Sequence, residues 1–371
     1  MRFGAYSSAF SLTTLTILKT QPIFLLGFGG VGRALARQII AARDWHARRN
    51  RVHLDIVGIA DSASAVIDLA GLSDSRIVQL IDQKSKGSRM SDQTSISSLS
   101  NFQSLSLPLA SILIDTTASD ATVPMLLDAK SKGMGMVLAN KLPIAGKIEW
   151  WDAIANEHSR WETTCGAALP VISTLSTLLD SGDEVIKIEG SLSGTLGYLA
   201  SQLEASVPFG NAVRDAKQRG YTEPDPRQDL GGLDAARKAL ILARMLGYRL
   251  EMSDVDVESL YPPSMDGLTV EQFMREVDGL NESMSARARV LTAGGRKLRY
   301  AATIESGKLS VGLVGAEPAS KLGGIRTSDS IVVFTTKYFS DNPVAVSGRG
   351  AGQDVTASGV LGDVISLSRV M

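Results

Sequence analysis

The chain has 371 residues, of which 44% are apolar and 21% charged, so we expect a globular protein of about two domains. Its 38 basic and 39 acidic side chains leave a formal net charge of −1, which offers no electrostatic basis for binding nucleic acid or an anionic membrane surface. One cysteine excludes an internal disulfide framework, three histidines share no zinc-ligand spacing, and no apolar run approaches the roughly 18 residues of a membrane helix.

The first 20 residues are rich in serine and threonine and carry two basic residues but no acid. This composition is compatible with an organelle transit segment, and equally with a short extension before the first strand. We therefore expect a cytoplasmic protein, or a plastid protein if residues 1–20 act as a transit segment.

Short apolar runs alternate with helical patterns in the first part of the chain, which predicts a parallel sheet with right-handed crossovers. Residues 44–51 are polar and basic and are expected to form a surface turn. The other predicted elements are strands at 22–26, 54–60, 112–115 and 136–139, helices at 33–43 and 125–129, and a serine-rich surface excursion at 82–106.

From about residue 161 the pattern changes, because apolar runs with hairpin-like spacing now alternate with helices. This predicts a second, mixed sheet with strands at 186–190, 298–304, 309–315, 331–335 and 344–347. The expected fold class is α/β, with a Rossmann-type dinucleotide-binding domain and an α+β domain that holds the mixed sheet.

A glycine loop follows the first predicted strand and precedes the first predicted helix, as the G-x-G-x-x-G pattern requires. The first glycine permits a tight turn, the second lets the backbone approach a pyrophosphate, and the third allows close packing of helix on sheet. N–H groups at the helix N-terminus add donors for phosphates. The loop therefore predicts a dinucleotide site, rather than a plain glycine-rich turn, at Gly27, Gly29, Gly30, Val31 and Gly32.

Asp61 ends the second predicted strand, where an acid can accept a hydrogen bond from a ribose 2′-hydroxyl. It lies 29 residues past Gly32 instead of the usual distance of about 20, and the segment 44–51 looks like the insertion responsible. Asp61 favours NAD, whereas Ser62, Ser64 and nearby arginines could accept the 2′-phosphate of NADP. Both cofactors are therefore candidates, and an ordinary turn residue is the alternative reading of Asp61.

Chemically active side chains are densest at residues 220–238, GYTEPDPRQDLGGLDAARK. Two prolines keep the first half out of a helix, and a helix can begin near 229–232 with Asp229 as its cap. On that helix Asp234 and Lys238 are four residues apart and share a face. A partly buried lysine held by a carboxylate can exchange a proton with a substrate hydroxyl, and Glu223 could receive a cationic amine. The alternative is an ordinary surface ion pair.

The 220–238 segment resembles the signature of the homoserine dehydrogenase family, G-Y-x-E-P-D-P-x-x-D-L-x-G-x-D-x-x-R-K. The resemblance covers about residues 21–371 and is strongest to the compact monofunctional form of plants and algae. Further family-like motifs occur in the expected order at 27–32, 115–117, 139–141, 162–170, 190–198 and 348–356.

The family resemblance implies NAD(P)-dependent interconversion of L-homoserine and L-aspartate 4-semialdehyde, in threonine, methionine and isoleucine biosynthesis. It also implies a homodimer, a cofactor domain at 1–160 completed by 353–371, and a catalytic and dimerisation domain at 161–352. The alternatives are a related dehydrogenase of another small hydroxy or aldehyde substrate, or a non-catalytic dinucleotide sensor. A sensor would not need the proton-transfer pair.

The same resemblance assigns roles to individual residues. Lys238 would be the general acid/base, oriented by Asp234, which would also bind the hydroxyl side of the substrate. Glu223 and Asp229 would bind substrate, and Lys141 would lie near the nicotinamide, where it can also shuttle protons. The further cofactor contacts implied are Thr117, Gly220, Glu223, Gly350 and Gly352.

A sodium ion is also implied, held by backbone carbonyls of Glu162, Cys165, Ala167 and Leu169. Cys165 and Ala168 stand where the family pattern has valine and glycine, and Ala168 is expected to strain this loop. Arg349 interrupts the glycine run at 348–352, which usually carries small residues.

Overall fold

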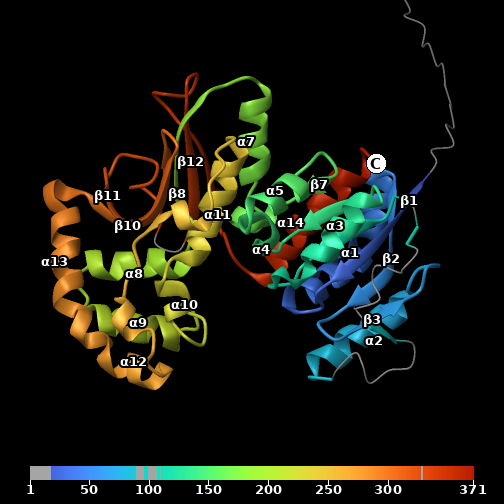
Figure 1. The fold of residues 1–371 in the computed structure, drawn as a ribbon, viewed down its shortest axis with the longest axis horizontal. Helices are drawn as coiled ribbons and strands as arrows, with labels where there is room; N and C mark the ends of the chain where they lie inside the picture. Colours follow the sequence, from blue (N-terminus) through green and yellow to red (C-terminus); the bar gives the residue numbers. More distant parts are fainter. Residues whose placement is uncertain (1–17, 89–95, 99–106, 109, 327–328) are drawn as a thin grey trace, which may run out of the picture.

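The computed structural model describes residues 18–88, 96–98, 107–108, 110–326 and 329–371. Figure 1 shows two lobes side by side, each built around one β-sheet, with α4, α5 and α11 between them. The predicted transit segment lies almost wholly outside the described residues, as does most of the serine-rich segment 82–106. No helix in the described part of the chain is both long and apolar enough to cross a membrane.

The first lobe holds a seven-stranded sheet in the order β4-β3-β2-β1-β5-β6-β7. The strands predicted in this region are confirmed, and β1, β2, β5, β6 and β7 run parallel, while β3 and β4 pair antiparallel at one edge. The bounds are β1 (Lys19–Leu26), β2 (Val52–Ala60), β3 (Ser64–Ile67), β4 (Ile96–Ser98), β5 (Ile112–Asp115), β6 (Gly135–Leu138) and β7 (Ser159–Arg160).

Helices cover this sheet. Helices α1 and α14 pack side by side, and their apolar side chains form one buried cluster with those of the sheet. The surface turn expected at 44–51 was wrong, because α1 continues through it and ends at Asn50, where Arg51 takes a left-handed φ of 58°. The segment contains no proline or glycine and favours helix through its alanine and arginine residues. The helices are α1 (Gly30–Asn50), α2 (Asp74–Ser85), α3 (Val123–Ser131), α4 (Leu142–Ala145), α5 (Ile148–Ile154) and α14 (Gln353–Ser368).

The second lobe holds the predicted mixed sheet, in the order β13-β12-β8-β10-β11-β9. Its pairs are antiparallel except for β9, which runs parallel to β11. The bounds are β8 (Val185–Ser191), β9 (Asp256–Val257), β10 (Lys297–Glu305), β11 (Lys308–Ala316), β12 (Ser330–Thr336) and β13 (Val344–Gly348).

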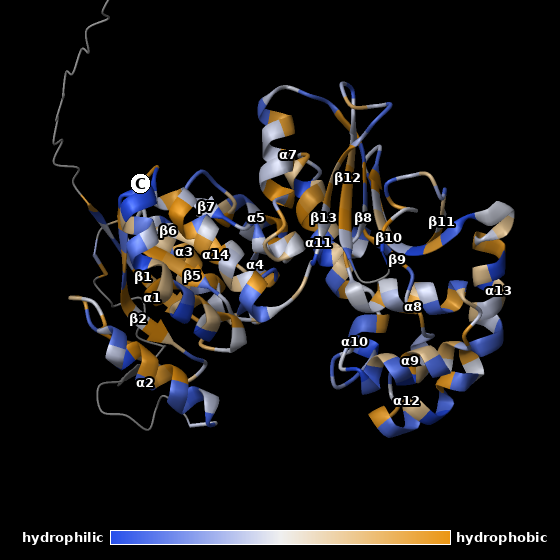
Figure 2. Cartoon of the chain, turned by 180° about the vertical axis from the view of Figure 1, so that it is seen from behind, coloured by the Kyte–Doolittle hydropathy of each residue, from blue (hydrophilic) through white to orange (hydrophobic). Residues whose placement is uncertain are grey.

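Helices α8, α11 and α13 contact strands β10 or β11, and the strands of both sheets are strongly apolar in Figure 2. One buried cluster runs from Phe24 in β1 to Leu240 in α11, so the two lobes share a core. Within this shared core α11 contacts α4 and α6 on one side and β10 and β11 on the other. The remaining helices are α6 (Thr163–Gly166), α7 (Val171–Asp180), α8 (Gly194–Glu204), α9 (Phe209–Gln218), α10 (Arg227–Leu230), α11 (Leu233–Met245), α12 (Val270–Glu276) and α13 (Asn281–Leu291).

Candidate active site

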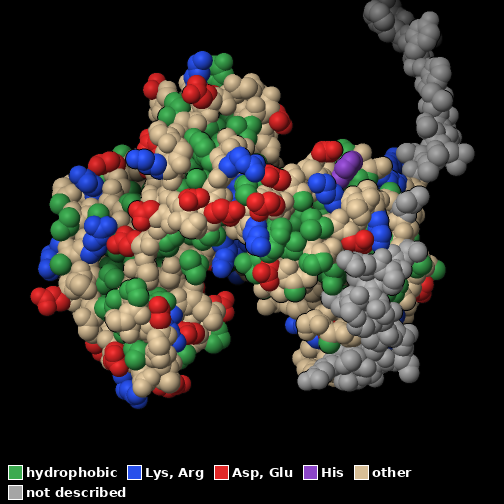
Figure 3. Space-filling model, in the orientation of Figure 1, with side chains coloured by type: hydrophobic (Ala, Val, Ile, Leu, Met, Phe, Trp, Pro, Cys, Tyr) green, Lys and Arg blue, Asp and Glu red, His purple; other side chains and the backbone are tan. Residues whose placement is uncertain are grey.

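A cavity of about 630 Å³ opens between the lobes, where the carboxyl ends of β5 and β6 face α11. Figure 3 shows acidic and basic side chains gathered where the two lobes meet. The carboxyl edge of a parallel sheet is where folds of this type bind their ligands. The cavity therefore lies where a dinucleotide in the first lobe and a small molecule in the second lobe could meet.

The glycine loop forms an open backbone cradle beside this cavity. Gly27 has a φ of +89°, and a Cβ on Gly32 would lie 2.1 Å from the Gly27 carbonyl oxygen, so both positions require glycine. Gly29 is the N-cap of α1, makes no side-chain cap, and would meet nothing within 4 Å if it carried a Cβ. The loop fits a pyrophosphate, because the space beside Gly29 is open at the N-terminus of α1. Val31 lines the cavity, and the Gln353 side chain packs on Gly30.

This geometry gives a prediction for Gly29→Ala. The variant should fold normally, because the added methyl group meets open space in the protein alone. It should weaken cofactor binding about tenfold or more, since the methyl group occupies the space that a pyrophosphate needs. Cofactor titration by fluorescence, together with thermal unfolding, checks this expectation. Unchanged affinity in the folded variant would show that the phosphates bind elsewhere.

A buried network positions Lys141 at the end of β6. Burial raises the pKa of Asp115, whose carboxylate accepts hydrogen bonds from Thr122 Oγ1 (2.6 Å), the Thr117 backbone N–H (2.9 Å) and Asn140 Nδ2 (3.0 Å). Asn140 Oδ1 in turn accepts from the Leu142 N–H (3.1 Å), the first residue of α4. Lys141 is therefore held between two anchored neighbours, and Thr117 is fixed at the wall of the cavity.

The loop before α11 departs from one expectation, because Asp229 does not cap the helix. Its Oδ2 instead accepts from the Glu223 backbone N–H (2.8 Å), and burial raises the pKa of Asp229. The chain makes the short helix α10 and then turns at Gly232, where φ is +72° and a Cβ would lie 2.1 Å from the Tyr300 hydroxyl. After that turn α11 begins at Leu233 with Gly232 as its N-cap, as the predicted start near 229–232 requires, whereas Asp229 binds the Glu223 backbone instead of capping the helix.

Three charged side chains converge at the mouth of the cavity. The Asp234 carboxylate pairs with Lys238 Nζ (2.8 Å) through one oxygen and with Lys141 Nζ (3.2 Å) through the other. Burial alone would raise the pKa of Asp234, but the ammonium groups of Lys238 and Lys141 hold it well below its usual range. The Lys238 side chain is 12% exposed and also donates to the Leu192 carbonyl (2.6 Å). The half-exposed Asp234 side chain thus joins a lysine of each lobe, Lys141 from the first and Lys238 from the second.

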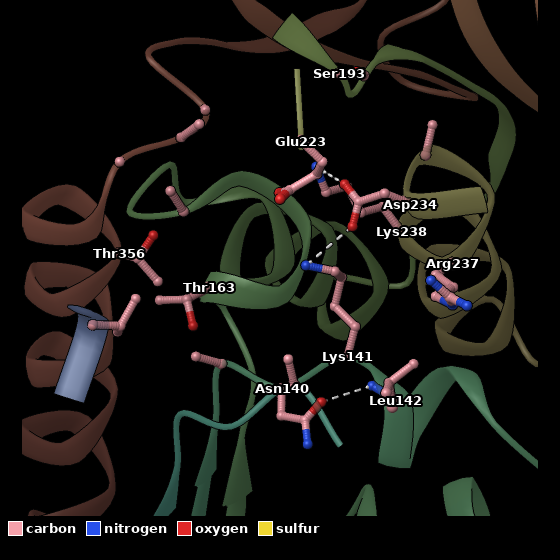
Figure 4. A pocket seen from close by; sticks show the side chains of 18 of the residues that line it. Asn140, Lys141, Leu142, Thr163, Ser193, Glu223, Asp234, Arg237, Lys238 and Thr356 are labelled. Carbon is pink, nitrogen blue, oxygen red and sulfur yellow. Dashed lines mark hydrogen bonds and ion pairs between the residues drawn. The ribbon is translucent and has the colours of Figure 1, made fainter. Parts of the chain in front are cut away.

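Figure 4 shows this cluster with Glu223 directly above it. The Glu223 side chain extends from its loop toward the cavity, while Arg237 points away from Asp234. The structure thus brings together most of the residues that the sequence singled out. Those that line the cavity are Val31, Thr117, Lys141, Ala167, Glu223, Asp229, Asp234, Lys238, Gly350 and Gly352.

Six of the expected cofactor residues do not line this cavity: the glycines of the loop next to Val31 (Gly27, Gly29, Gly30 and Gly32), and Gly220 and Asp61. Gly220 lines a neighbouring cavity of about 560 Å³, which borders the same segment 350–352. Asp61 ends β2 as expected, but its Oδ1 accepts from the N–H groups of Ala63 and Ser64 (both 3.0 Å) and its Oδ2 pairs with Lys84 Nζ (2.5 Å). Although burial opposes it, these contacts lower the pKa of Asp61. The Asp61 carboxylate is therefore already engaged within the protein.

The loop with the expected sodium ligands is compact and lies beside Lys238. The left-handed residue is Ala167, with φ 53° and ψ −115°, so the strain expected at Ala168 falls one residue earlier. The Leu169 carbonyl accepts from the Val171 N–H (2.8 Å). The described residues contain no cluster of three or more metal-ligating side chains, and the sodium site, which would use carbonyls, stays a prediction.

Cys165 is buried in the same loop, where its Sγ lies 3.5 Å from the Lys238 carbonyl oxygen. Burial raises the pKa of the Cys165 thiol to about 12, so this side chain has no thiolate to offer as a nucleophile.

Sequence reasoning did not single out several residues that line the cavity. Ser193 caps α8 by accepting from the Leu196 N–H (3.2 Å) and lies inside the motif 190–198, which was the available signal. Arg237 lies inside the 220–238 signature, three residues after Asp234, although its side chain points away from that carboxylate. Asn140, Thr163, Gln228 and Thr356 also line the cavity and lie inside the motifs at 139–141, 162–170, 220–238 and 348–356, which were the available signal.

Comparison with known proteins identifies a family and several relatives of this chain. Residues 170–365 match the family model described as homoserine dehydrogenase. The homoserine dehydrogenase of Schizosaccharomyces pombe is 32% identical over 360 residues, which make up 93% of this chain and 94% of that protein. A bifunctional aspartokinase/homoserine dehydrogenase of Haemophilus influenzae is 33% identical over 354 residues, 94% of this chain but 43% of that protein. The chain thus spans less than half the length of this bifunctional relative.

Solved structures share the fold along nearly the whole chain. A Candida auris protein of unknown function has a TM-score of 0.82 at 28% identity, and the match covers 95% of this chain and 99% of that one. A hyperthermophilic archaeal homoserine dehydrogenase, solved in complex with NADPH, has a TM-score of 0.72 at 24% identity over 95% of this chain and 99% of its own. The α/β fold class predicted from the sequence is confirmed.

Proposed function

The chain belongs to the homoserine dehydrogenase family, and on this premise we propose that it interconverts L-homoserine and L-aspartate 4-semialdehyde with NAD or NADP. One observation carries the proposal. Asp234 holds the ammonium groups of Lys238 (2.8 Å) and Lys141 (3.2 Å) at the junction of the lobes, beside an open glycine loop. This geometry supports a proton-transfer role for the cluster, because a cofactor in the first lobe and a substrate in the second would meet there.

The first lobe holds the cofactor in this proposal. A bound nicotinamide cofactor would supply the redox step, exchanging a hydride with C4 of the substrate. The N-terminal N–H groups of α1 would bind its pyrophosphate beside Gly29, and Val31, Thr117 and Lys141 line the cavity next to that loop. Gly350 and Gly352 line the same cavity.

Lys238 handles the proton that accompanies the hydride. In the reducing direction its ammonium donates a proton to the aldehyde oxygen, and in the oxidising direction its amine accepts the proton of the hydroxyl group. Asp234 keeps Nζ oriented, because the Leu192 carbonyl (2.6 Å) and the Asp234 carboxylate (2.8 Å) together fix two of its hydrogen-bond directions. The third direction is left for the substrate oxygen.

Carboxylates select the amino group of the substrate. Glu223 extends toward the cavity, and its backbone is tied to Asp229, so the two acids stand together on one stiff loop. A substrate ammonium is the ligand that this pair would bind best. Substrate binding, proton transfer and cofactor binding are thereby assigned to three separate segments of the chain.

A direct assay tests this function. The purified protein is mixed with L-aspartate 4-semialdehyde and either NADH or NADPH, and loss of the reduced cofactor is followed by its absorbance. We expect cofactor oxidation with this substrate and almost none with succinic semialdehyde, which lacks only the amino group that Glu223 and Asp229 would bind. No oxidation with either cofactor, or equal rates with both aldehydes, would contradict the proposal.

Lys84 decides the cofactor preference in our proposal, because its ion pair neutralises Asp61. An engaged carboxylate would repel a 2′-phosphate less, and the Lys84 side chain, which is 25% exposed, would offer that phosphate an ammonium group. Lys84→Ala should raise the KM for NADPH about tenfold and leave that for NADH nearly unchanged. Lys86→Ala is the matched control, since Lys86 pairs with Asp82 on the surface of the same segment. Equal changes for both cofactors would reject this role.

We further propose that the cofactor domain comprises residues 1–160 and 353–371, and that residues 161–352 form the catalytic and dimerisation domain. Two observations support this division: the seven-stranded sheet ends at Arg160, and α14 packs on α1 within one apolar cluster. A homodimer, a sodium ion at the Glu162–Leu169 loop and a cytoplasmic or plastid location complete the proposal. Sedimentation analysis and sodium dependence of activity test the first two.

A further inference from the structure

A buried arginine near the C-terminal end of α11 reaches across to the cofactor lobe. Arg244 is only 3% exposed. Its guanidinium donates to the carbonyl oxygens of Ile144 (2.8 Å), Gly146 (2.7 Å) and Leu250 (2.8 Å), and it pairs with the Glu251 carboxylate (3.1 Å). Every arm of the guanidinium fork is therefore bound by protein groups.

The acceptors of Arg244 belong to the segment that begins with Lys141. Lys141 is the N-cap of α4, and Ile144 and Gly146 lie at the end of that single-turn helix, whose last carbonyls lack partners within the helix. Glu251 extends the connection, because its second oxygen accepts from the Ile148 N–H (2.9 Å) at the start of α5. The side chains of Arg244 and Glu251 thus supply hydrogen bonds to the Ile144 and Gly146 carbonyls and to the Ile148 N–H.

Helix α11 holds the Lys141 segment at two points. Asp234 contacts Lys141 near the start of α11, and Arg244 contacts Ile144 and Gly146 near its end. Ten residues of helix separate these points by about 15 Å. These two contacts join the start and the end of the segment 141–146 to α11, and they act together with the Asn140–Leu142 hydrogen bond and the burial of Ile144.

We propose that Arg244 is a positioning residue for the reaction: by holding the carbonyls of Ile144 and Gly146 it sets where Lys141 Nζ stands relative to Asp234 and Lys238. This inference rests on the proposed function of the Lys141–Asp234–Lys238 cluster. Arg244 lies outside the cavity and acts only through the segment 141–148.

Arg244→Lys tests the proposal, because lysine keeps the charge but cannot span three carbonyls as the guanidinium fork does. We expect kcat to fall about tenfold with little change in cofactor affinity, since a small misplacement of a catalytic group slows the chemical step. In a Lys141→Ala background the same substitution should lower kcat by less than about twofold, because the effects of two residues that act through one group are not additive. Arg249→Lys is the matched control, because Arg249 links the same two regions through Asp152 on the surface.

Glu251→Gln provides a second, milder variant in case Arg244→Lys does not fold. The amide keeps an acceptor for the Ile148 N–H and removes only the charge that faces Arg244. We expect a smaller fall in kcat that again disappears in the Lys141→Ala background. Amide hydrogen exchange is measured in parallel and should accelerate at 141–148 in either variant, with residues 233–240 unchanged.

The exchange measurement separates this proposal from the proposed function. A wild-type protein without activity would reject the function, yet faster exchange confined to 141–148 would still support the positioning role. An active protein whose variants keep full kcat, or whose losses multiply with Lys141→Ala, would overturn the role of Arg244. Loss of thermal stability without a change in kcat would likewise mark Arg244 as structural only.

Discussion

Replacing Lys238 with alanine is expected to lower kcat about a hundredfold or more while the fold stays intact, because general acid–base catalysis contributes factors of this size. The side chain is 12% exposed and ends at the junction of the lobes, held by Asp234 and the Leu192 carbonyl. Truncation removes the group that would give the substrate oxygen its proton and leaves the glycine loop untouched. Steady-state kinetics with L-aspartate 4-semialdehyde, together with cofactor titration, measure both effects.

A second lysine in the chain provides a matched control for this experiment. Lys132 pairs with Asp128 at 2.7 Å on α3 with the same spacing of four residues, but it lies on the surface outside the cavity. Lys132→Ala should leave kcat unchanged. Near-normal turnover in Lys238→Ala would show that Lys238 forms an ion pair with Asp234 but has no role in catalysis.

Replacing Asp234 with asparagine is expected to reduce kcat by about a hundredfold as well, because both lysines lose their shared counterion. The amide has one oxygen to accept a hydrogen bond, and its NH₂ group faces the second ammonium unfavourably. Lys238 and Lys141 would then repel each other across the site. Asp128→Asn on α3 is the control that removes an equivalent aspartate from a surface pair.

The same variant has a pH dependence with a definite sign. The ammonium groups of Lys238 and Lys141 keep the pKa of Asp234 below its usual range, despite burial. The stability that this ionised carboxylate adds is present above about pH 4, the ordinary value for aspartate, and is lost as the pH falls through the lower folded-state pKa. The melting temperatures of the wild type and Asp234→Asn should therefore converge on acidification. A gap that widens toward low pH would contradict this account.

The strands of both sheets could be predicted closely, because apolar runs that stop at a glycine or an aspartate mark their ends. The run at 112–115 coincides with β5, and 54–60 lies within β2. Of the strands that were missed, β4, β7 and β9 have three residues or fewer and carry too little pattern to stand out, and β3 is a short edge strand of four residues. The extension of α1 through 44–50 was missed because a polar helix on a surface has no apolar stripe.

The part of the candidate site whose residues are close together in the sequence could be predicted. Asp234 and Lys238 share a helical face by spacing alone, and the structure places them 2.8 Å apart. Lys141 could be added only through the family resemblance, because a pair between separate lobes leaves no mark in the local sequence. The Asp61–Lys84 ion pair and the Arg244 contacts were missed for the same reason, since tertiary packing alone brings these groups together.

In our proposal the Lys238 amine contacts the oxygen atom at C4 of the substrate while the cofactor occupies the glycine loop. A crystal structure of the protein with L-homoserine and oxidised cofactor measures this directly. We predict a distance between Lys238 Nζ and the C4 hydroxyl oxygen of about 2.6–3.2 Å, with the substrate ammonium on Glu223. A hydroxyl group bound far from Lys238, with Nζ still turned to Asp234 and Leu192 alone, would contradict the account.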